Sequence, residues 1–376
     1  MDRLQNLLSG NHSISQLGTS SPSKNLENLR IISGNSHPQL AKKVAEYLDI
    51  SITPSIADKF SNSEIRIQIQ ENVRRKDVVI IQTGSQDTKL GYSINDFLME
   101  TFIMINACRL SSVGEIILLI PCFPYARQDK KDISRAPISG RTVADLLQTV
   151  GVTRVITLDL HASQIAGFFS IPVDNLYSVN IMAEYLKQNY LQQNYLQQKT
   201  IISESTTSSS TQDHQSDQND YVLVSPDAGG IKRMDSLAQK VSMKSVIMHK
   251  TRDHQQKSVV KQTVLIGEKD CVKGKSCIII DDMCDTGGTI CQASKTLMEE
   301  GAKDVRLLLV HGIFSGPALE RLNQYDYIKE VIVTNSLPQE ENIKICPKIK
   351  VIDISPLLAE VVNRLQTGES ISSLFN

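Results

Sequence analysis

The sequence lacks the features of several large protein classes. No apolar run approaches the length of about 20 residues that a membrane-spanning helix needs. The formal net charge of the 376 residues is −1, so the excess of basic residues that marks many nucleic-acid-binding proteins is missing. The first 27 residues contain no apolar segment of the secretory type. We therefore expect a cytoplasmic protein that binds neither nucleic acid nor membrane.

The cysteines do not form a recognisable metal-binding pattern. There are seven, an odd number, and no pair has the C-x₂-C spacing of a zinc site. Most of them lie within apolar runs, where a free thiol behaves as a small hydrophobic side chain. We interpret them as reduced core thiols.

The order of apolar segments predicts an α/β protein of two domains. A chain of 376 residues with 40% hydrophobic residues can bury two cores. Short β-branched runs alternate with amphipathic segments in both halves, which predicts mainly parallel sheets flanked by helices. The expected organisation is a disordered extension over 1–28, an N-terminal domain over 29–176, a second domain over 177–356 and, over 357–376, a helix and tail that pack on the N-terminal domain. Residues 198–220, rich in Ser, Thr, Gln and Asp, are expected to be a disordered insert in the second domain.

One stretch, residues 277–290, carries the strongest chemical signal. An apolar run over 277–280 is typical of a strand that is buried on both faces, and Asp281 and Asp282 follow where this strand should end. Small residues over 285–289 then lead into a helical pattern that begins at Ile290. A strand, a small-residue loop and a helix N-terminus together form a phosphate-binding geometry, whereas adjacent carboxylates suit ribose hydroxyls or a cation shared with the sugar phosphate. The Gly-Lys-Ser/Thr ending of a Walker A loop is absent.

Two further segments follow predicted strands of the first half. Residues 127–135 contain four cations and two acids, and they lie where the carboxyl end of a parallel strand is expected, the usual ligand edge of an open α/β sheet. We favour anion binding there over a solvated surface loop. Asp159 and His161 follow the next strand, but an Asp-x-His pair is by itself a weak indication of a metal site.

Five motifs occur in one order along the chain, and together they resemble those of ribose-phosphate diphosphokinases (phosphoribosyl pyrophosphate synthetases). They are Phe-Pro-Tyr-Ala-Arg-Gln-Asp-Lys-Lys-Asp, Asp-Leu-His-Ala-Ser-Gln-Ile, Ser-Pro-Asp-Ala-Gly-Gly, His-Lys-Thr-Arg and Asp-Asp-Met-Cys-Asp-Thr-Gly-Gly-Thr. The resemblance runs from about Leu29 to the C-terminus, interrupted by the insert. A phosphoribosyltransferase would account for the 277–290 stretch only.

The resemblance implies two phosphoribosyltransferase-like domains and transfer of the diphosphoryl group of ATP to the 1-hydroxyl of ribose 5-phosphate. It implies ribose 5-phosphate binding by Asp227, Asp281, Asp282, Asp285, Thr286, Gly287, Gly288 and Thr289. It implies ATP binding by Arg127, Gln128, Asp132 and His161, with Phe60, Asn62 and Glu64 supplied by a neighbouring subunit, so that a homo-oligomer shares the site. It implies Mg²⁺ near Asp159, His161 and Asp174. Lys250 and Arg252, on a mobile loop, would be catalytic.

The sequence departs from the family pattern at four places. Ser170 stands where a second acid is usual, and Asp253-His254-Gln255-Gln256 follow Arg252 where basic residues are usual. Extra length lies near 85–94, and the insert is additional. These departures keep open a non-catalytic subunit that associates with active paralogues and tunes them.

Overall fold

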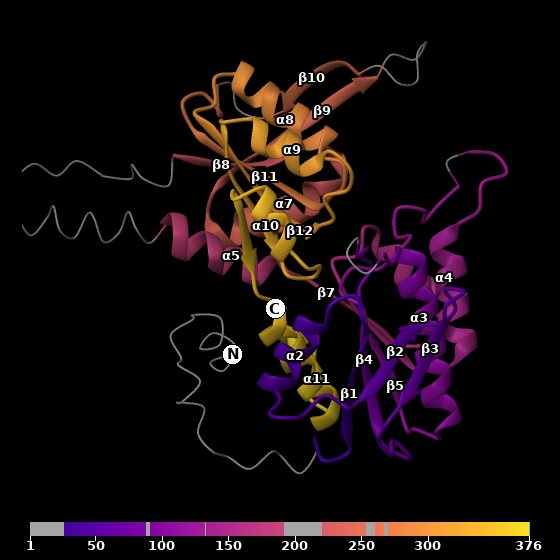
Figure 1. Ribbon diagram of the computed structural model, residues 1–376. Coiled ribbons are helices and arrows are strands. Elements are labelled where there is room, and N and C mark those ends of the chain that lie inside the picture. Colours follow the sequence, from indigo (N-terminus) through magenta and orange to yellow (C-terminus); the bar gives the residue numbers. More distant parts are fainter. Residues whose placement is uncertain are drawn as a thin grey trace, which may run out of the picture. The chain divides into compact units, whose positions relative to one another are not determined.

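The computed structural model describes residues 26–87, 91–131, 133–191, 220–252, 260–266 and 270–375, with the backbone alone at 249–252 and 260–264 (Figure 1). The chain forms two compact units. The first comprises Met1–Tyr177, Asn335–Pro338 and Asp353–Asn376, and the second comprises Ser178–Thr334 and Gln339–Ile352. The expected disorder over 1–25 and 198–219 falls outside the described residues.

The first unit is built on a five-stranded parallel sheet with the order β1-β4-β5-β6-β7. Its strands are β1 (Leu29–Ser33), β4 (Asp77–Ile81), β5 (Ile116–Leu119), β6 (Arg154–Leu158) and β7 (Val173–Leu176). The β-branched runs form strands because both faces are covered, as in other parallel sheets. One face packs against α3 (Ile94–Leu110) and α4 (Ser139–Val150), and α2 (Pro38–Tyr47) contacts β1.

The first unit also contains an antiparallel hairpin and a short helix. The hairpin pairs β2 (Ser55–Lys59) with β3 (Ile65–Ile69), and β3 alternates between half-buried and exposed residues as its sequence predicts. The 3₁₀ helix η3 (Ser163–Phe168) follows β6.

The second unit contains a seven-stranded sheet with the order β10-β9-β8-β11-β12-β13-β14, parallel except where β9 meets β10. Its strands are β8 (Tyr221–Ser225), β9 (Lys244–Arg252), β10 (Val260–Ile266), β11 (Ser276–Cys284), β12 (Asp304–Gly312), β13 (Ile328–Thr334) and β14 (Ile349–Ile352). The helical elements are α5 (Val179–Leu186), η4 (Lys187–Leu191), η5 (Ala228–Gly230), α7 (Ile231–Val241), α8 (Gly288–Glu299), α9 (Ala318–Gln324) and α10 (Glu340–Ile345). Cys277 and Ile279 pack with α8 and α9, while Ile278 and Ile280 on the opposite face are equally buried. The α/β fold class expected from the sequence is confirmed.

The C-terminal segment belongs to the first unit. The helix α11 (Ser355–Thr367) packs against α2, and the 3₁₀ helix η6 (Ser372–Leu374) follows it. Asn335–Pro338, which we expected in the second domain, is also part of the first unit because the carbonyl of Asn335 lies 3.0 Å from His37 Nε2 and that of Ser336 accepts from Thr83 Oγ1. Asp353, likewise expected in the second domain, pairs with Lys43 at 2.7 Å.

At the borders of the two segments that we predicted to be disordered, some residues are in fact ordered. Leu26 is buried, and the carbonyl of Asn28 accepts from Asp77 N, so both residues belong to the ordered first unit. Asp220 accepts a hydrogen bond from Ser276 N at the start of β11. Over the described residues, no helix is both long enough and apolar enough to cross a membrane.

Aromatic residues hold together the two chain ends that border residues 192–219. The rings of Tyr190 and Tyr221 lie 5.3 Å apart, and the guanidinium of Arg306 lies 5.4 and 5.5 Å from their centroids. The hydroxyl of Tyr190 donates to Glu330, which also faces Arg306. Burial and this hydrogen bond raise the pKa of Tyr190, so its hydroxyl keeps its proton. This cluster thus joins η4 to β8 within the second unit.

Deletion of residues 201–218 should therefore leave the melting temperature within about 2 °C of the parent. The closure entropy of a flexible loop changes slowly with its length, and the deletion retains the cluster. Differential scanning calorimetry provides the measurement. Tyr190→Ala is the contrasting variant, since truncating a buried aromatic residue typically costs about 3–5 kcal/mol. A large fall in melting temperature on deletion would contradict the role given to the cluster.

Candidate functional site

The strand β11 carries both adjacent aspartates of the 277–290 stretch. The sequence predicted that the strand ends at Ile280, which is wrong, because β11 continues to Cys284. The reason is its neighbour: β12 offers backbone partners as far as Gly312, with Asp281 opposite Leu309 and Cys284 opposite Gly312. Asp281 and Asp282 are therefore fixed in a ladder, not displayed on a loop.

Burial makes the acid pair electrostatically unusual. Asp282 is 6% exposed, so it is buried at a position where we expected the strand to have ended. Asp281 accepts a hydrogen bond from Asp282 N at 2.9 Å. Desolvation raises the pKa of Asp281, and the negative charges of Asp282 and Asp227 raise it further. The unliganded site thus holds carboxylates whose charge is unfavourable, and donors such as sugar hydroxyls or a cation would relieve it.

A short loop connects β11 to α8. Gly287 is its turning point, with φ of 74°, a left-handed conformation that glycine adopts without strain. It is also the N-cap of α8 and provides no side-chain cap, so the first amides of the helix have no such partner. Thr286, Gly288 and Thr289 are exposed beside these amides. The loop has the geometry of an anion-binding helix N-terminus, as predicted.

The connection from β12 to α9 supports this loop, and sequence reasoning did not find it. The carbonyl of Cys284 accepts from the amides of Ile313 and Phe314 at 3.0 and 2.9 Å. Arg321 on α9 donates from Nη1 to the carbonyl of Thr286 at 3.1 Å. No local motif marks these residues, because they reach the loop through the β11–β12 pairing.

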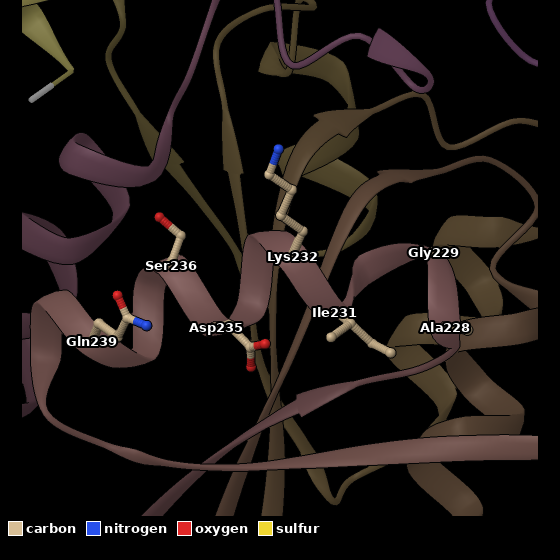
Figure 2. Close-up of a pocket in the computed structure, with 7 residues that line it drawn as sticks. All are labelled: Ala228, Gly229, Ile231, Lys232, Asp235, Ser236 and Gln239. Carbon is tan, nitrogen blue, oxygen red and sulfur yellow. The ribbon is translucent and has the colours of Figure 1, made fainter. Parts of the chain in front are cut away.

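The loop after β8 lies at the same edge of the sheet, since β8 pairs with β11 in parallel. Asp227 caps η5 by accepting from Gly229 N at 2.9 Å and from Gly230 N at 3.3 Å. A hollow of about 510 Å³ adjoins this loop (Figure 2). The side chains of Lys232 and Ser236 project from the same side of the helix α7. Asp227 thus has a local structural role besides its negative charge near Asp281.

The two residues expected to be catalytic lie on β9, next to β8. Lys250 pairs with Thr263 and Arg252 with Val260 in the ladder with β10. We expected a mobile loop at these positions, but the backbone is a strand up to Arg252. The register of this ladder is irregular between Val260 and Gln262.

In the first unit, two of the predicted ligand segments lie at one sheet edge. Arg127 and Gln128 follow β5, whereas Asp159 and His161 follow its neighbour β6. Gln164 Nε2 donates to Asp129 Oδ2 at 2.7 Å and ties the two segments together. Arg127, Gln128 and His161 are exposed. An exposed cation and an exposed imidazole on the two segments at this edge suit an anionic ligand.

Asp159 has a strained backbone. Its φ is 43°, and the residue is 6% exposed. Non-glycine residues in this region are uncommon and often belong to functional sites. Its amide donates to the carbonyl of Leu176 at 2.9 Å, which holds it at the end of β6.

Asp174 does not join Asp159. It pairs with Ile156 in the β6–β7 register, three residues before Asp159, a separation of about 10 Å along a strand. Its carboxylate accepts from Arg154 Nη1 at 2.6 Å. Over the described part of the chain, no three His, Cys, Asp or Glu residues are arranged to hold a metal ion. Asp159 alone fits the donor chemistry of Mg²⁺, which commonly uses one or two carboxylates, phosphate oxygens and water.

The turn between β2 and β3 carries Phe60, Asn62 and Glu64, and all three are exposed. Phe60 N donates to the carbonyl of Glu64 at 2.8 Å, and the Phe60 ring is 50% exposed. An exposed aromatic ring on a rigid turn suits contact with another molecule. Asp132 lies outside the described residues.

Comparison with known proteins supports one family. The model for the N-terminal domain of ribose phosphate pyrophosphokinase matches residues 29–151, and that for the phosphoribosyl synthetase-associated domain matches 259–376. The crystal structure of phosphoribosylpyrophosphate synthetase from Mycobacterium smegmatis is similar with 37% identity and a TM-score of 0.76, over 91% of this chain and 100% of that one. The chain belongs to the phosphoribosylpyrophosphate synthetase family. The family expectation from the motifs is confirmed.

A second solved structure is far less similar to this phosphoribosylpyrophosphate synthetase family member. It is a purine phosphoribosyltransferase from Pyrococcus horikoshii Ot3, with 16% identity and a TM-score of 0.24 over 36% of this chain and 78% of that one. Such a likeness is too slight to bear on fold or function.

The acid pair generates a prediction about pH and stability. The pKa of Asp281 in the folded chain lies above its ordinary value of 3.8, so the folded state holds this proton more tightly than the unfolded state. This contribution to stability is complete below 3.8 and is lost as the pH rises through the raised pKa. Asp281→Asn should therefore stabilise the unliganded protein above neutral pH, by on the order of 1 kcal/mol or a few degrees.

Melting temperatures measured from pH 5 to 9 check this expectation. Asp326→Asn, at an exposed position, is the control for loss of one negative charge from the second unit. The pH dependence should be flatter in Asp281→Asn than in either the parent or the control. Parallel curves for all three would show that Asp281 titrates normally.

Proposed function

We propose that this protein transfers the β,γ-diphosphoryl group of ATP to the 1-hydroxyl of ribose 5-phosphate, giving 5-phosphoribosyl 1-diphosphate and AMP for nucleotide biosynthesis. The bond between the α-phosphate bridging oxygen and the β-phosphorus breaks, and a bond from the sugar O1 to that phosphorus forms as O1 loses its proton. The observation that carries the proposal is the second-unit edge, where a desolvated acid pair leads directly into a helix N-terminus without a side-chain cap.

This edge suits a phosphorylated sugar. Carboxylate oxygens of Asp281 and Asp282 would accept from the ribose hydroxyls, while the amides at the start of α8 would bind the 5-phosphate. Such hydrogen bonds suit the pair because they compensate the desolvation of its charge. The remaining expected ligands Asp285, Thr286, Gly287, Gly288 and Thr289 lie in the same loop.

The edge of β5 and β6 suits ATP. Arg127 and Gln128 would contact phosphate and nucleotide groups, with His161 nearby, and Asp159 would hold Mg²⁺ carried on the phosphates. The ion would neutralise charge that develops on the transferred group. We keep Asp132 as a proposed ATP ligand, and we do not place Asp174 at the ion because Arg154 already pairs with its carboxylate.

The transfer would depend on positioning and charge neutralisation, since phosphoryl-type transfer needs little covalent assistance. Lys250 and Arg252 would supply positive charge to the diphosphoryl group in the transition state. The exposed turn with Phe60, Asn62 and Glu64 would complete the adenine site of a neighbouring copy, which makes a homo-oligomer part of the proposal.

A regulatory subunit is the second candidate function. It is favoured by Ser170, whose amide donates to Gln148 Oε1 at 2.5 Å, at a position where the family usually has an acid. The acid Asp253 directly after Arg252 favours it too, because it could pair with that arginine and hold it away from the nucleotide. Such a subunit would associate with active paralogues as a hetero-oligomer.

The purified protein, incubated with ATP, Mg²⁺ and ribose 5-phosphate, should release AMP. Lys250→Ala should lower kcat by about 10²–10³ with little change in the affinity for ATP, because a charge matched to the transition state acts on turnover and not on binding. Steady-state kinetics measure both. Lys303→Ala, which removes an exposed cation at the start of β12, is the matched control and should keep full activity.

Two outcomes would decide against this mechanism. An inactive parent that gains activity as Asp253→Lys would support the regulatory subunit. An active parent whose Lys250→Ala variant keeps its kcat would remove Lys250 from catalysis.

A further inference from the structure

The phosphate loop, residues 285–289, has negative side chains in and near it but no positive side chain of its own. It contains no lysine or arginine, and Asp281, Asp282 and Asp285 all lie within or directly before it. A phosphate monoester brings close to two further negative charges at neutral pH. The helix N-terminus contributes only about half a positive charge. A sugar phosphate bound here needs a cation from elsewhere in the fold.

The fold brings one guanidinium to this loop. Arg321 Nη1 donates to the carbonyl of Thr286 at 3.1 Å and lies 3.7 Å from the point where a Cβ on Gly288 would stand. Ala318, one turn earlier on α9, lies 3.7 Å from the corresponding point on Gly287. Both distances are ordinary van der Waals separations, so α9 packs directly against the loop. Arg321 is an exposed residue, so its remaining donors can be reached from solvent.

The hydrogen bond from Arg321 also orients the loop. In a trans peptide the carbonyl of Thr286 and the amide of Gly287 point in opposite directions. That amide donates to the thiol of Cys284. The peptide is therefore held from both sides, and the amides at the start of α8 are left for an anion.

The position of Arg321 is itself strongly determined. The β12–α9 connection passes through Phe314, a buried residue with φ of 52°, which costs backbone strain. Gln339 Nε2 donates to the carbonyl of Gly312 at 2.9 Å, and the carbonyl of Cys284 accepts the amides of Ile313 and Phe314. These contacts set the path of the chain that leads to α9.

We propose that Arg321 is the cation of the phosphate loop. It fixes the Thr286 peptide and offers its remaining guanidinium donors to the 5-phosphate, so that the site prefers phosphorylated ribose to ribose. A guanidinium has five N–H donors, of which the hydrogen bond to Thr286 uses one. The inference rests on the proposed binding of ribose 5-phosphate at this loop.

Three substitutions separate charge from hydrogen bonding. Arg321→Met removes both, Arg321→Gln can still donate to the Thr286 carbonyl but has no charge, and Arg321→Lys keeps the charge without the planar fork. Titration calorimetry with ribose 5-phosphate should show about 10–100-fold weaker binding for the Met and Gln variants, and a smaller loss for Lys. Lys295→Gln, an exposed cation on α8, is the control and should bind like the parent.

Two further readouts distinguish this role from a purely structural one. The KM for ATP and the melting temperature should stay unchanged in all three variants, because exposed substitutions seldom alter stability by more than about 0.5 kcal/mol. The preference for ribose 5-phosphate over ribose should fall in the Met and Gln variants.

The inference would be overturned by an Arg321→Met variant that binds ribose 5-phosphate as tightly as the parent. A variant with a lower melting temperature that also binds ATP more weakly would show that Arg321 has a purely structural role. That result would overturn the inference too. A parent that binds no ribose 5-phosphate at all would instead disprove the proposed function, and the inference with it.

Discussion

The pairing of β11 with β12 beyond the acid pair is the constraint on which the second-unit site depends. It carries Asp281 and Asp282 into a buried ladder, and desolvation there disfavours the charge of Asp281. The same pairing brings the β12–α9 connection against the end of β11, where the carbonyl of Cys284 accepts two amides. One backbone ladder therefore sets both the electrostatics of the acids and the geometry of the phosphate loop. A site of this kind is less stable when empty than when occupied, which favours ligands that donate hydrogen bonds or carry positive charge.

In the first unit, the proposed ligand edge after β5 and β6 is held together differently. Here the segments after β5 and β6 are irregular, and side-chain contacts such as Gln164 with Asp129 hold them together. Asp159 keeps a left-handed backbone under this restraint. Arg127, Gln128 and His161 are exposed at this edge and Asp159 is buried, a combination that suits a polyanion carrying its own cation, whereas we propose a phosphorylated sugar for the edge of the second unit.

Family membership and activity rest on different grounds in this protein. The matches over 29–151 and 259–376, together with a structure that is 37% identical, establish the family. Two of the four departures, Ser170 and the residues after Arg252, fall near groups proposed for the metal ion and for catalysis, so they bear on turnover and not on the fold. Asp174, expected at the metal ion, is instead held in β7 by its ion pair with Arg154.

The sequence alone determined the α/β class, the apolar strands and the strand–turn–helix at Gly287, because these follow from local periodicity and from a backbone conformation that glycine permits. It also located the sheet edges at which we propose the ligands bind, since the carboxyl ends of parallel strands lie at one side of a sheet. Only the tertiary structure decided where β11 ends, which acids are buried and which of them meet. It alone assigned Asn335–Pro338 to the first unit and brought Arg321 to the phosphate loop. These outcomes depend on strand register and on hydrogen bonds between residues far apart in the chain, and neither leaves a periodic signal in the sequence.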